Sequence, residues 1–598
     1  MSSYRLPDGS VPILLSSDNP DLLGREAAAV ADYLADHSEV TPDRLADMLF
    51  RTRSPRRHRA VVMADAQTDV IAALRAVADG RPHPAVVRSE RAATAQRVAY
   101  IFPGQGSQRP GMGAMLYEHS SAYRDAVDEC DKVFHDLYGW SPRAYLLEAG
   151  QEADDKALTV QPALFVQMVG VAAMWQAAGV GPGVTVGHSQ GEIAAAYVSG
   201  AQTLRDAVRI VTTRARIVDD RQLSGYSMAV LGIDRDECED LIARQADFVE
   251  LSVINSRHII AISGERDAVV AIVESLNAAG KFAKEIRVRY PAHTSYVSAG
   301  RELLAATVGP EMDNHAFIDT EIDCIGATMG DRLHPGLSIV DYWYLNLRNR
   351  VRFDLAIRKA VDAGASTFIE ISEHPTLMLA IQENLSEIPV QREFQTLGTS
   401  RRTAEDLREF TRNLATVAVH DANYRWEALR EPGAGGVPAL PLLDFPNTQM
   451  SAKSLWAPFD YARTAEKSTA GGDSDDSTVA PQRVLETWTR LQRRTMVPPR
   501  TLAVVDPSGA HAELAAAVRA AAPRQGATVI EPGTGARPDT LVVLAAVPHP
   551  MDPDTIYRPR PVDLALRRDP GLAPKVEACR ASCPENGRGF ELTERLYL

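Results

Sequence analysis

The chain has 598 residues, of which 45% are hydrophobic and 24% are charged, and its net charge is -14. This composition is ordinary for a globular protein of several domains, and the acidic balance argues against a general nucleic-acid-binding role. Five cysteines without a CxxC pair predict a reducing compartment and no metal site. We see no apolar run near the ~20 residues of a membrane span, so we expect a cytoplasmic protein.

Residues 1–97 are predicted to form a small α/β domain. The strand-like runs VPILLSS and HRAVVMAD alternate with the amphipathic helical runs LLGREAAAVADYLADH and QTDVIAALRAVADG. A basic cluster, RTRSPRRHR at 51–59, interrupts the acidic chain. We interpret it as a solvated domain edge, with docking to an acidic partner as the alternative.

A second, larger α/β unit is predicted over residues 98–425. It begins with the strand in RVAYIFPGQGSQ. Within it, residues 228–290 follow the order strand, helix, strand, strand, helix, strand, which is the ferredoxin-like plan. We therefore expect a ferredoxin-like subdomain inserted into the larger unit.

The composition changes after Trp426. Residues 426–484 are predicted to be a linker, and the low-complexity stretch at 464–481 is predicted to be disordered. Residues 485–598 show two strands around a helix, a partial Rossmann-like fragment, followed by an irregular tail. No GxGxxG motif follows either strand, so we predict no dinucleotide site.

The stretch TVGHSQGE reads as a strand, a glycine-flanked Ser189 and the start of an Ala-rich helix. That layout places a serine on a strained turn as an exposed nucleophile, with the Gln190 N–H at a helix N-terminus where it can bind an oxyanion. In FPGQGSQ, glycines on both sides of Gln105 free its N–H to face a cavity at the end of a strand. The sequence thus predicts a serine that accepts an acyl group.

A serine nucleophile needs a base, and two histidines are candidates. His293 in RYPAHTS lies where the inserted subdomain returns to the main body, and His374 in ISEHPTL follows a strand. His188 points the wrong way. Arg214 in RIVTTRARIV is suited to bind a carboxylate in a partly buried pocket, although a surface position is the default for a helical arginine.

Seven motifs together resemble the acyltransferase domain of modular polyketide synthases and the malonyl-CoA:acyl-carrier-protein transacylases. They are FPGQGSQ, QPALF, GHSQGE, TTRAR, YPAHT, YWYLNLRNRVRF and FIEISEHPTL. The N-terminal residues resemble the linker domain that precedes such acyltransferases, and the C-terminal fragment is similar to the structural half of a ketoreductase. The acyltransferase-first layout resembles the polyketide subunit of mycobactin-type siderophore assembly.

The resemblance implies an α/β-hydrolase-like core and a role for each matching residue. Ser189 is expected to be the nucleophile, His293 the general base and Arg214 the group that binds the free carboxylate of a malonyl-type substrate. The N–H groups of Gln105 and Gln190 are expected to form the oxyanion hole. A carbonyl of the loop at 372–374 is expected to orient the His293 ring, so that His374 is a bystander.

The same resemblance predicts the residues that line the substrate pocket. They are Gln161, Tyr290, Ala292, Met228 and Asn255. The small Ala292 leaves room for a methyl branch without requiring one, so malonyl and methylmalonyl both stay open.

The predicted reaction moves an acyl group from CoA through an acyl-serine to the phosphopantetheine thiol of an acyl carrier protein. We expect no permanently bound cofactor, and we expect the carrier protein and a ketosynthase on separate chains. Two alternatives remain: a serine acyl-CoA hydrolase or editing thioesterase, and a non-catalytic scaffold subunit of a synthase.

Overall fold

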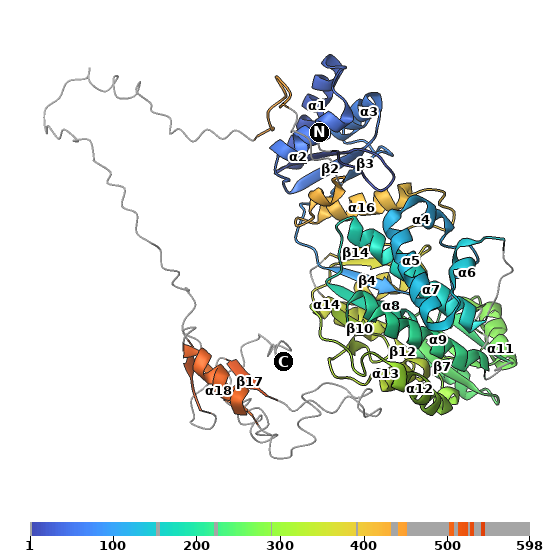
Figure 1. The fold of residues 1–598 in the computed structure, drawn as a ribbon. Helices are drawn as coiled ribbons and strands as arrows, with labels where there is room; N and C mark the ends of the chain where they lie inside the picture. Colours follow the sequence, from blue (N-terminus) through green and yellow to red (C-terminus); the bar gives the residue numbers. More distant parts are fainter. Residues whose placement is uncertain are drawn as a thin grey trace, which may run out of the picture. The chain divides into compact units, whose positions relative to one another are not determined.

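The computed structural model describes residues 3–150, 156–220, 225–286, 288, 290–389, 393–431, 440–450, 501–506, 512–523, 527–531 and 540–544. The chain divides into two compact units, Met1–Leu455 and Trp456–Leu598 (Figure 1). The predicted disordered stretch at 464–481 and the irregular tail lie outside the described residues. The domain boundaries within each unit stay predictions.

A six-stranded sheet forms the centre of the first unit, in the order β11-β10-β5-β4-β13-β14. Its strands are β4 (Val98–Phe102), β5 (Val184–Gly187), β10 (Asp323–Gly326), β11 (Asp331–Arg332), β13 (Thr367–Glu370) and β14 (Gln395–Leu397). All neighbours are parallel except β10 and β11. Because β4 and β5 are adjacent and parallel, the loops that carry Gln105 and Ser189 leave the same edge of the sheet.

Helices cover this sheet, as Figure 1 shows. They are α4 (Ala114–His119), α5 (Ser121–Tyr138), α6 (Arg143–Leu147), α7 (Ala157–Ala177), α8 (Gly191–Val198), α9 (Leu204–Asp220), α12 (Gly300–Val308), α13 (Ile339–Arg348), α14 (Phe353–Asp362) and α15 (Met378–Ser386). The mixed α/β fold class predicted from the sequence is confirmed.

Helix α7 corrects one expectation from the sequence. It has 21 residues with a mean hydropathy of 1.6 over its most apolar window, so by length and composition it could cross a membrane. However, 83% of that window is buried inside the protein, where α7 packs against α5, α8 and α9. A helix surrounded by other elements is apolar on all sides, and this packing accounts for the run that we had overlooked.

The inserted subdomain has the predicted ferredoxin-like order. It consists of β6 (Tyr226–Leu231), α10 (Arg235–Ala243), β7 (Val249–Ile254), β8 (Ile260–Glu265), α11 (Arg266–Ala278) and β9 (Ala283–Ile286). These strands are antiparallel in the order β7-β8-β6-β9. The short β12 (Val351–Arg352), which we did not predict, joins the edge of β7 in parallel and ties the subdomain to the segment after α13.

The N-terminal part contains an antiparallel sheet in the order β1-β2-β3, formed by β1 (Pro12–Ser17), β2 (His58–Met63) and β3 (Val86–Arg88). Its helices are α1 (Pro20–Asp36), α2 (Pro42–Thr52) and α3 (Gln67–Ala78), which share one core with Ile13 and Leu15. Leu14 points to the opposite face, where α16 (Arg408–His420) packs on β2 and β3. Strand alternation therefore gives this small sheet two cores.

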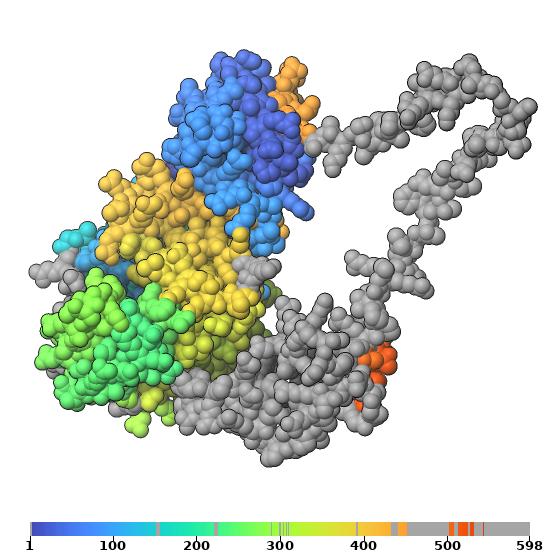
Figure 2. Space-filling view, turned by 180° about the vertical axis from the view of Figure 1, so that it is seen from behind, coloured from blue at the N-terminus to red at the C-terminus, as the bar shows by residue number. Residues whose placement is uncertain are grey.

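The basic cluster at 51–59 joins the N-terminal part to later segments. Arg59 is 3% exposed and donates to the carbonyl oxygen of Asp421 at 2.6 Å. Arg53 pairs with Glu26 and lies 5.1 Å over the ring of Phe445. The segment at 440–450, orange in Figure 2, lies against the blue N-terminal part, and the contact of Arg53 with Phe445 is one of the contacts between them. The prediction of a solvated edge is thus wrong for these two arginines.

The second unit contains a three-stranded parallel sheet in the order β16-β15-β17. Its elements are β15 (Thr501–Val505), α18 (Ala512–Ala521), β16 (Thr528–Val529) and β17 (Thr540–Val543). The parallel strands and the helix between them agree with the predicted partial Rossmann-like fragment, and β16 is an additional strand.

Candidate active site

Ser189 lies on the turn between β5 and α8. Its φ is 54°, in the left-handed region that non-glycine residues rarely adopt. A Cβ at Gly187 would overlap Glu192, and a Cβ at Gly191 would overlap the carbonyl oxygen of Phe102. The two glycines therefore allow the strand, the turn and the helix to pack closely enough to hold the serine in this strained conformation.

His293 contacts the serine directly. Its Nε2 lies 2.7 Å from Ser189 Oγ, and its own φ is 60°. Nδ1 lies 3.0 Å from the backbone oxygen of Asn349, which can only accept, so Nδ1 holds the proton and the Nε2 lone pair faces the serine hydroxyl. The expectation that the loop at 372–374 orients this ring is wrong, because Asn349 supplies the carbonyl.

Burial, together with the positive charge of Arg214 and the neighbouring His188, lowers the pKa of His293 to about 3. The ring is therefore neutral in the form able to accept a proton. Nε2 of His188 bonds to Asn255 Oδ1 at 2.8 Å, so the structure turns this histidine away from the serine, as predicted.

Arg214 on α9 is 1% exposed and forms three hydrogen bonds with neutral acceptors. Nη1 donates to Gln161 Oε1 at 2.7 Å, Nη2 to Ser189 Oγ at 3.3 Å, and Nε to Asn346 Oδ1 at 3.3 Å. Within the part of the chain that the structure describes, no carboxylate forms an ion pair with this guanidinium. A buried cation without a counter-ion is costly unless an anionic ligand binds beside it.

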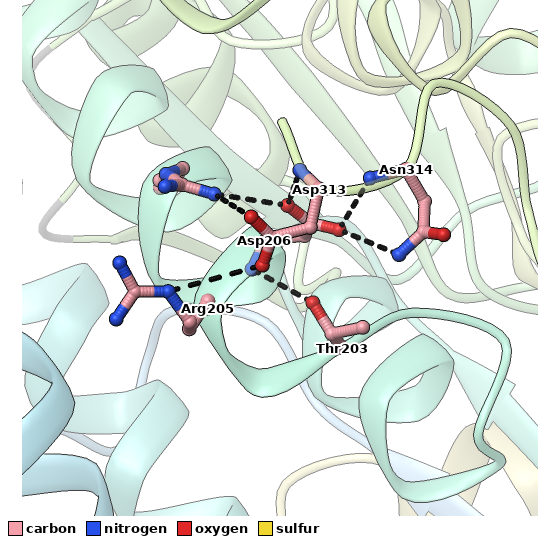
Figure 3. Close-up of polar contacts among 6 residues, drawn as sticks. Thr203, Arg205, Asp206, Asp313 and Asn314 are labelled. Carbon is pink, nitrogen blue, oxygen red and sulfur yellow. Dashed lines mark hydrogen bonds and ion pairs between the residues drawn. The ribbon is translucent and has the colours of Figure 1, made fainter. Parts of the chain in front are cut away.

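The helices that hold Arg214 and Gln161 are fixed at their ends. At the start of α9, the fully buried Asp206 accepts from the backbone N–H of Asp313 at 2.8 Å and of Asn314 at 3.2 Å (Figure 3). At its end, the Asp219 carboxylate accepts from the first two N–H groups of α7, at 3.0 and 2.8 Å. The Asp219 bonds join α9 to α7 and the Asp206 bonds join it to the segment at 313–314, so both ends of the helix that carries the guanidinium are held.

Two backbone N–H groups near the serine have no hydrogen-bond partner among the described residues. They belong to Gln105 and Gln190, the two residues expected to bind an oxyanion. The loop of Gln105 lies against the serine, since a Cβ at Gly104 would be 3.5 Å from the Cβ of Ser189. Two backbone donors without a partner among the described residues therefore lie close to the nucleophile in the chain or in space.

Tyr290 connects Gln105, which lies near the nucleophile, with Gln161, which bonds to Arg214. Its hydroxyl donates to Gln105 Oε1 at 3.1 Å and accepts from Gln161 Nε2 at 3.3 Å. The pocket residue Ala292 follows in the same loop and is 2% exposed. Two further pocket residues were predicted. Met228 is in the hydrophobic core on β6, and the side-chain oxygen of Asn255 forms a hydrogen bond with His188.

Sequence reasoning missed Asn346 and Asn349, which lie in α13 and directly after it. Their motif, YWYLNLRNRVRF, indicated the family resemblance but no role for either asparagine. The available signal was a polar residue on the apolar face of an amphipathic helix, where Asn346 is 1% exposed. A buried amide is expected to have hydrogen-bond partners, so this position pointed to a polar site.

A strained serine after a parallel strand, bonded to a buried histidine, defines the class of enzymes that use an activated serine. Residues 99–423 match the family model described as the acyl transferase domain, which is 325 of the 598 residues. The chain therefore belongs to the acyl transferase domain family, and it is an acyltransferase.

Its relatives are polyketide synthases. The chain is 31% identical over 530 residues to Erythronolide synthase EryA3 of Saccharopolyspora erythraea, covering 88% of this chain and 16% of that protein. It is 34% identical over 398 residues to the Spectinabilin polyketide synthase system protein NorA' of Streptomyces orinoci, covering 66% and 11%. This chain thus spans less than a fifth of either relative.

Among solved structures, the chain is similar to the acyltransferase domain from module 8 of the salinomycin polyketide synthase. The sequence identity is 30% and the TM-score is 0.63, and the match covers 70% of this chain and 97% of that one. The resemblance to polyketide synthase acyltransferases that the motifs indicated is therefore confirmed.

Proposed function

We propose that this acyltransferase moves a malonyl-type acyl group from CoA to the phosphopantetheine thiol of an acyl carrier protein. The observation that supports a dicarboxylic substrate is the buried guanidinium of Arg214, whose partners among the described residues are all neutral and whose Nη2 is 3.3 Å from the Ser189 oxygen. A free carboxylate on the acyl group would supply the missing counter-ion beside the reacting serine.

In the first step, Ser189 Oγ attacks the thioester carbonyl carbon and His293 Nε2 takes its proton. The N–H groups of Gln105 and Gln190 bind the oxyanion of the tetrahedral intermediate. The C–S bond then breaks, and the CoA sulfur leaves as a thiol with the proton from His293.

In the second step, the thiol of the carrier protein attacks the acyl-serine. His293 accepts the thiol proton and returns it to Ser189 Oγ as the ester bond breaks, so the free enzyme is restored. Such a double displacement separates donor from acceptor, and the acyl-serine must last until the carrier arrives. We expect a ketosynthase to use the loaded carrier, and the siderophore pathway stays a prediction.

The acyl branch that the site accepts depends on the pocket beside the nucleophile. Tyr290 is held by two hydrogen bonds, and Ala292 contributes only a methyl group. The side-chain amide of Gln190 is 2% exposed and has no partner among the described residues. A polar group of this kind could face the α-carbon of the acyl chain, and both malonyl and methylmalonyl fit the proposal.

The test is the intact mass of the full chain after mixing with malonyl-CoA, methylmalonyl-CoA or acetyl-CoA, with Ser189→Ala as control. We expect one or both of the first two to add one acyl group, and the control to add none. Equal labelling by acetyl-CoA would contradict a dicarboxylic substrate. Release of free acid faster than transfer to a carrier would favour a hydrolase, and no labelling would favour a scaffold subunit.

A further inference from the structure

Glu192 is a buried carboxyl group that the proposed chemistry does not use. It lies in the first turn of α8 and is 1% exposed. Oε1 accepts from the N–H of Thr328 at 2.9 Å and from its hydroxyl at 2.8 Å, and Oε2 accepts from the Tyr342 hydroxyl. The space around it is closed, because a Cβ at Gly326 would lie 2.5 Å from Oε2. Burial raises the pKa of Glu192 to about 7, and the hydrogen bonds from Tyr342 and Thr328 favour its ionised form, in which both oxygens can only accept.

These bonds set the direction of the Thr328 hydroxyl. Its single proton points to Glu192, so its oxygen can only accept from its other neighbour, Asn346 Nδ2, at 3.1 Å. The same Nδ2 donates to the backbone oxygen of Ser189 at 2.9 Å. Because the Thr328 hydroxyl oxygen and the Ser189 backbone oxygen both lie beside Nδ2, the other end of the amide, Oδ1, faces Arg214 Nε, 3.3 Å away.

We propose that Glu192 and Thr328 are positioning residues that fix the orientation of the Asn346 amide and thereby hold Arg214 ready for the carboxylate of the acyl group. If the amide turned over, its NH₂ group would face the guanidinium, and two donors would oppose each other. The proposal rests on the proposed function, because it gives the guanidinium the task of binding a dicarboxylic acyl chain.

The test compares two substitutions at one position. Thr328→Val has nearly the same shape but lacks the hydroxyl, whereas Thr328→Ser keeps it. We expect Thr328→Val to lower kcat/KM for malonyl-CoA about tenfold, the loss of one hydrogen bond to a charged group, and Thr328→Ser to stay within about twofold. Asn346 also bonds to the backbone oxygen of Ser189, so a smaller loss is expected for acetyl-CoA. The ratio of the two kcat/KM values should therefore fall severalfold in Thr328→Val and stay within about twofold in Thr328→Ser.

A purely structural role would give a different result. Equal losses for malonyl-CoA and acetyl-CoA, or an unchanged malonyl preference in Thr328→Val, would overturn the proposal. Glu192→Gln is the second variant. The backbone N–H of Thr328 can only donate, so the new amide keeps its oxygen beside Thr328 and turns its NH₂ group to the Tyr342 hydroxyl, which can accept. The malonyl preference is therefore expected to stay within about twofold of the wild type, and a selective loss for malonyl-CoA in this variant would contradict the proposal.

A second measurement separates this proposal from the proposed function. In protein labelled with ¹⁵N-arginine, the Nε–H signal of Arg214 is identified by its loss in Arg214→Lys. We expect Thr328→Val to speed its exchange with water about tenfold, as the loss of a hydrogen-bond acceptor predicts, while Thr328→Ser does not. This result holds even if the wild type fails to accept malonyl, and unchanged exchange would overturn the proposal.

Discussion

The two sides of the site are built in different ways. Ser189 and His293 lie on loops, and both have left-handed backbone conformations, with φ of 54° and 60°. Arg214 and Gln161 lie within helices whose ends are locked by the carboxylates of Asp206 and Asp219. The nucleophile and the base depend on strained turns, whereas the guanidinium depends on rigid helix packing.

This difference separates reactivity from selectivity. A strained turn exposes one oxygen and one nitrogen to a reacting carbonyl, where small displacements change the rate. A buried guanidinium on α9, with partners on α7 and α13, keeps its place when substrates differ. We therefore expect changes at Ser189 and His293 to affect all acyl donors alike. Changes at Arg214 and Gln161 are expected to affect dicarboxylic donors far more than others, because Arg214 also bonds to the Ser189 oxygen.

The largest effect is expected for His293→Ala. Removal of the base leaves the Ser189 hydroxyl without an acceptor for its proton, so acylation should fall about 10³- to 10⁴-fold for malonyl-CoA and acetyl-CoA alike. Rapid-quench acylation with both donors measures the two rates. A loss confined to malonyl-CoA would show that His293 contributes to substrate selectivity, and it would contradict the separation of reactivity from selectivity.

Arg214→Ala is expected to have the next largest effect. It removes the positive charge that faces the acyl carboxylate, so kcat/KM for malonyl-CoA should fall about 30- to 1000-fold. That for acetyl-CoA should fall much less, through the lost bond to Ser189 Oγ alone. The change in the ratio of the two constants is the measurement. Arg214→Lys is the control, since a point charge should recover only part of the bidentate binding.

Gly191→Ala tests how far the nucleophile turn depends on close backbone packing. The added Cβ would overlap the carbonyl oxygens of Phe102 and Pro103, so we expect a loss of about 3 kcal/mol in the free energy of unfolding. Denaturant unfolding measures this loss. The matched control is Gly181→Ala, where a Cβ meets no atom within 4 Å and little change is expected. Similar losses in both variants would show that the turn is not the cause.

The smallest effect is expected from pH. The pKa of His293 is lowered to about 3, so the ring stays neutral and able to accept a proton at every pH above about 5. The single-turnover acylation rate should change less than about twofold between pH 5.5 and 8. A tenfold loss below pH 6.5, the range of an unperturbed histidine, would contradict this expectation.

The same shift affects stability. The folded state holds His293 at a pKa below its unfolded value, so the unfolded chain binds more protons between about pH 3 and 6.5. This contribution to stability is complete above pH 6.5 and is lost as the pH falls through that window. Less acid sensitivity is expected in His293→Gln, and equal acid sensitivity would argue that the imidazole is exposed.

The local sequence determined the nucleophile turn, the ferredoxin-like order and the fold class. Glycines at fixed distances from Ser189, and strand and helix periods over residues 226–286, are properties of neighbours in the chain, and physical rules read them directly. The sequence also placed Arg214 and His293 among the candidates. It left the choice between His293 and His374 open until the motif resemblance decided it.

Only the tertiary structure showed what holds these groups. The carbonyl that orients His293 belongs to Asn349, and the acceptor for Arg214 Nε belongs to Asn346, which lies 132 residues farther along the chain. A backbone carbonyl has no sequence signature, and a long-range hydrogen bond depends on how α9 and α13 pack. The same packing buries Arg214 among partners that are all neutral in the described part of the chain, and no local pattern could reveal this for a helical arginine.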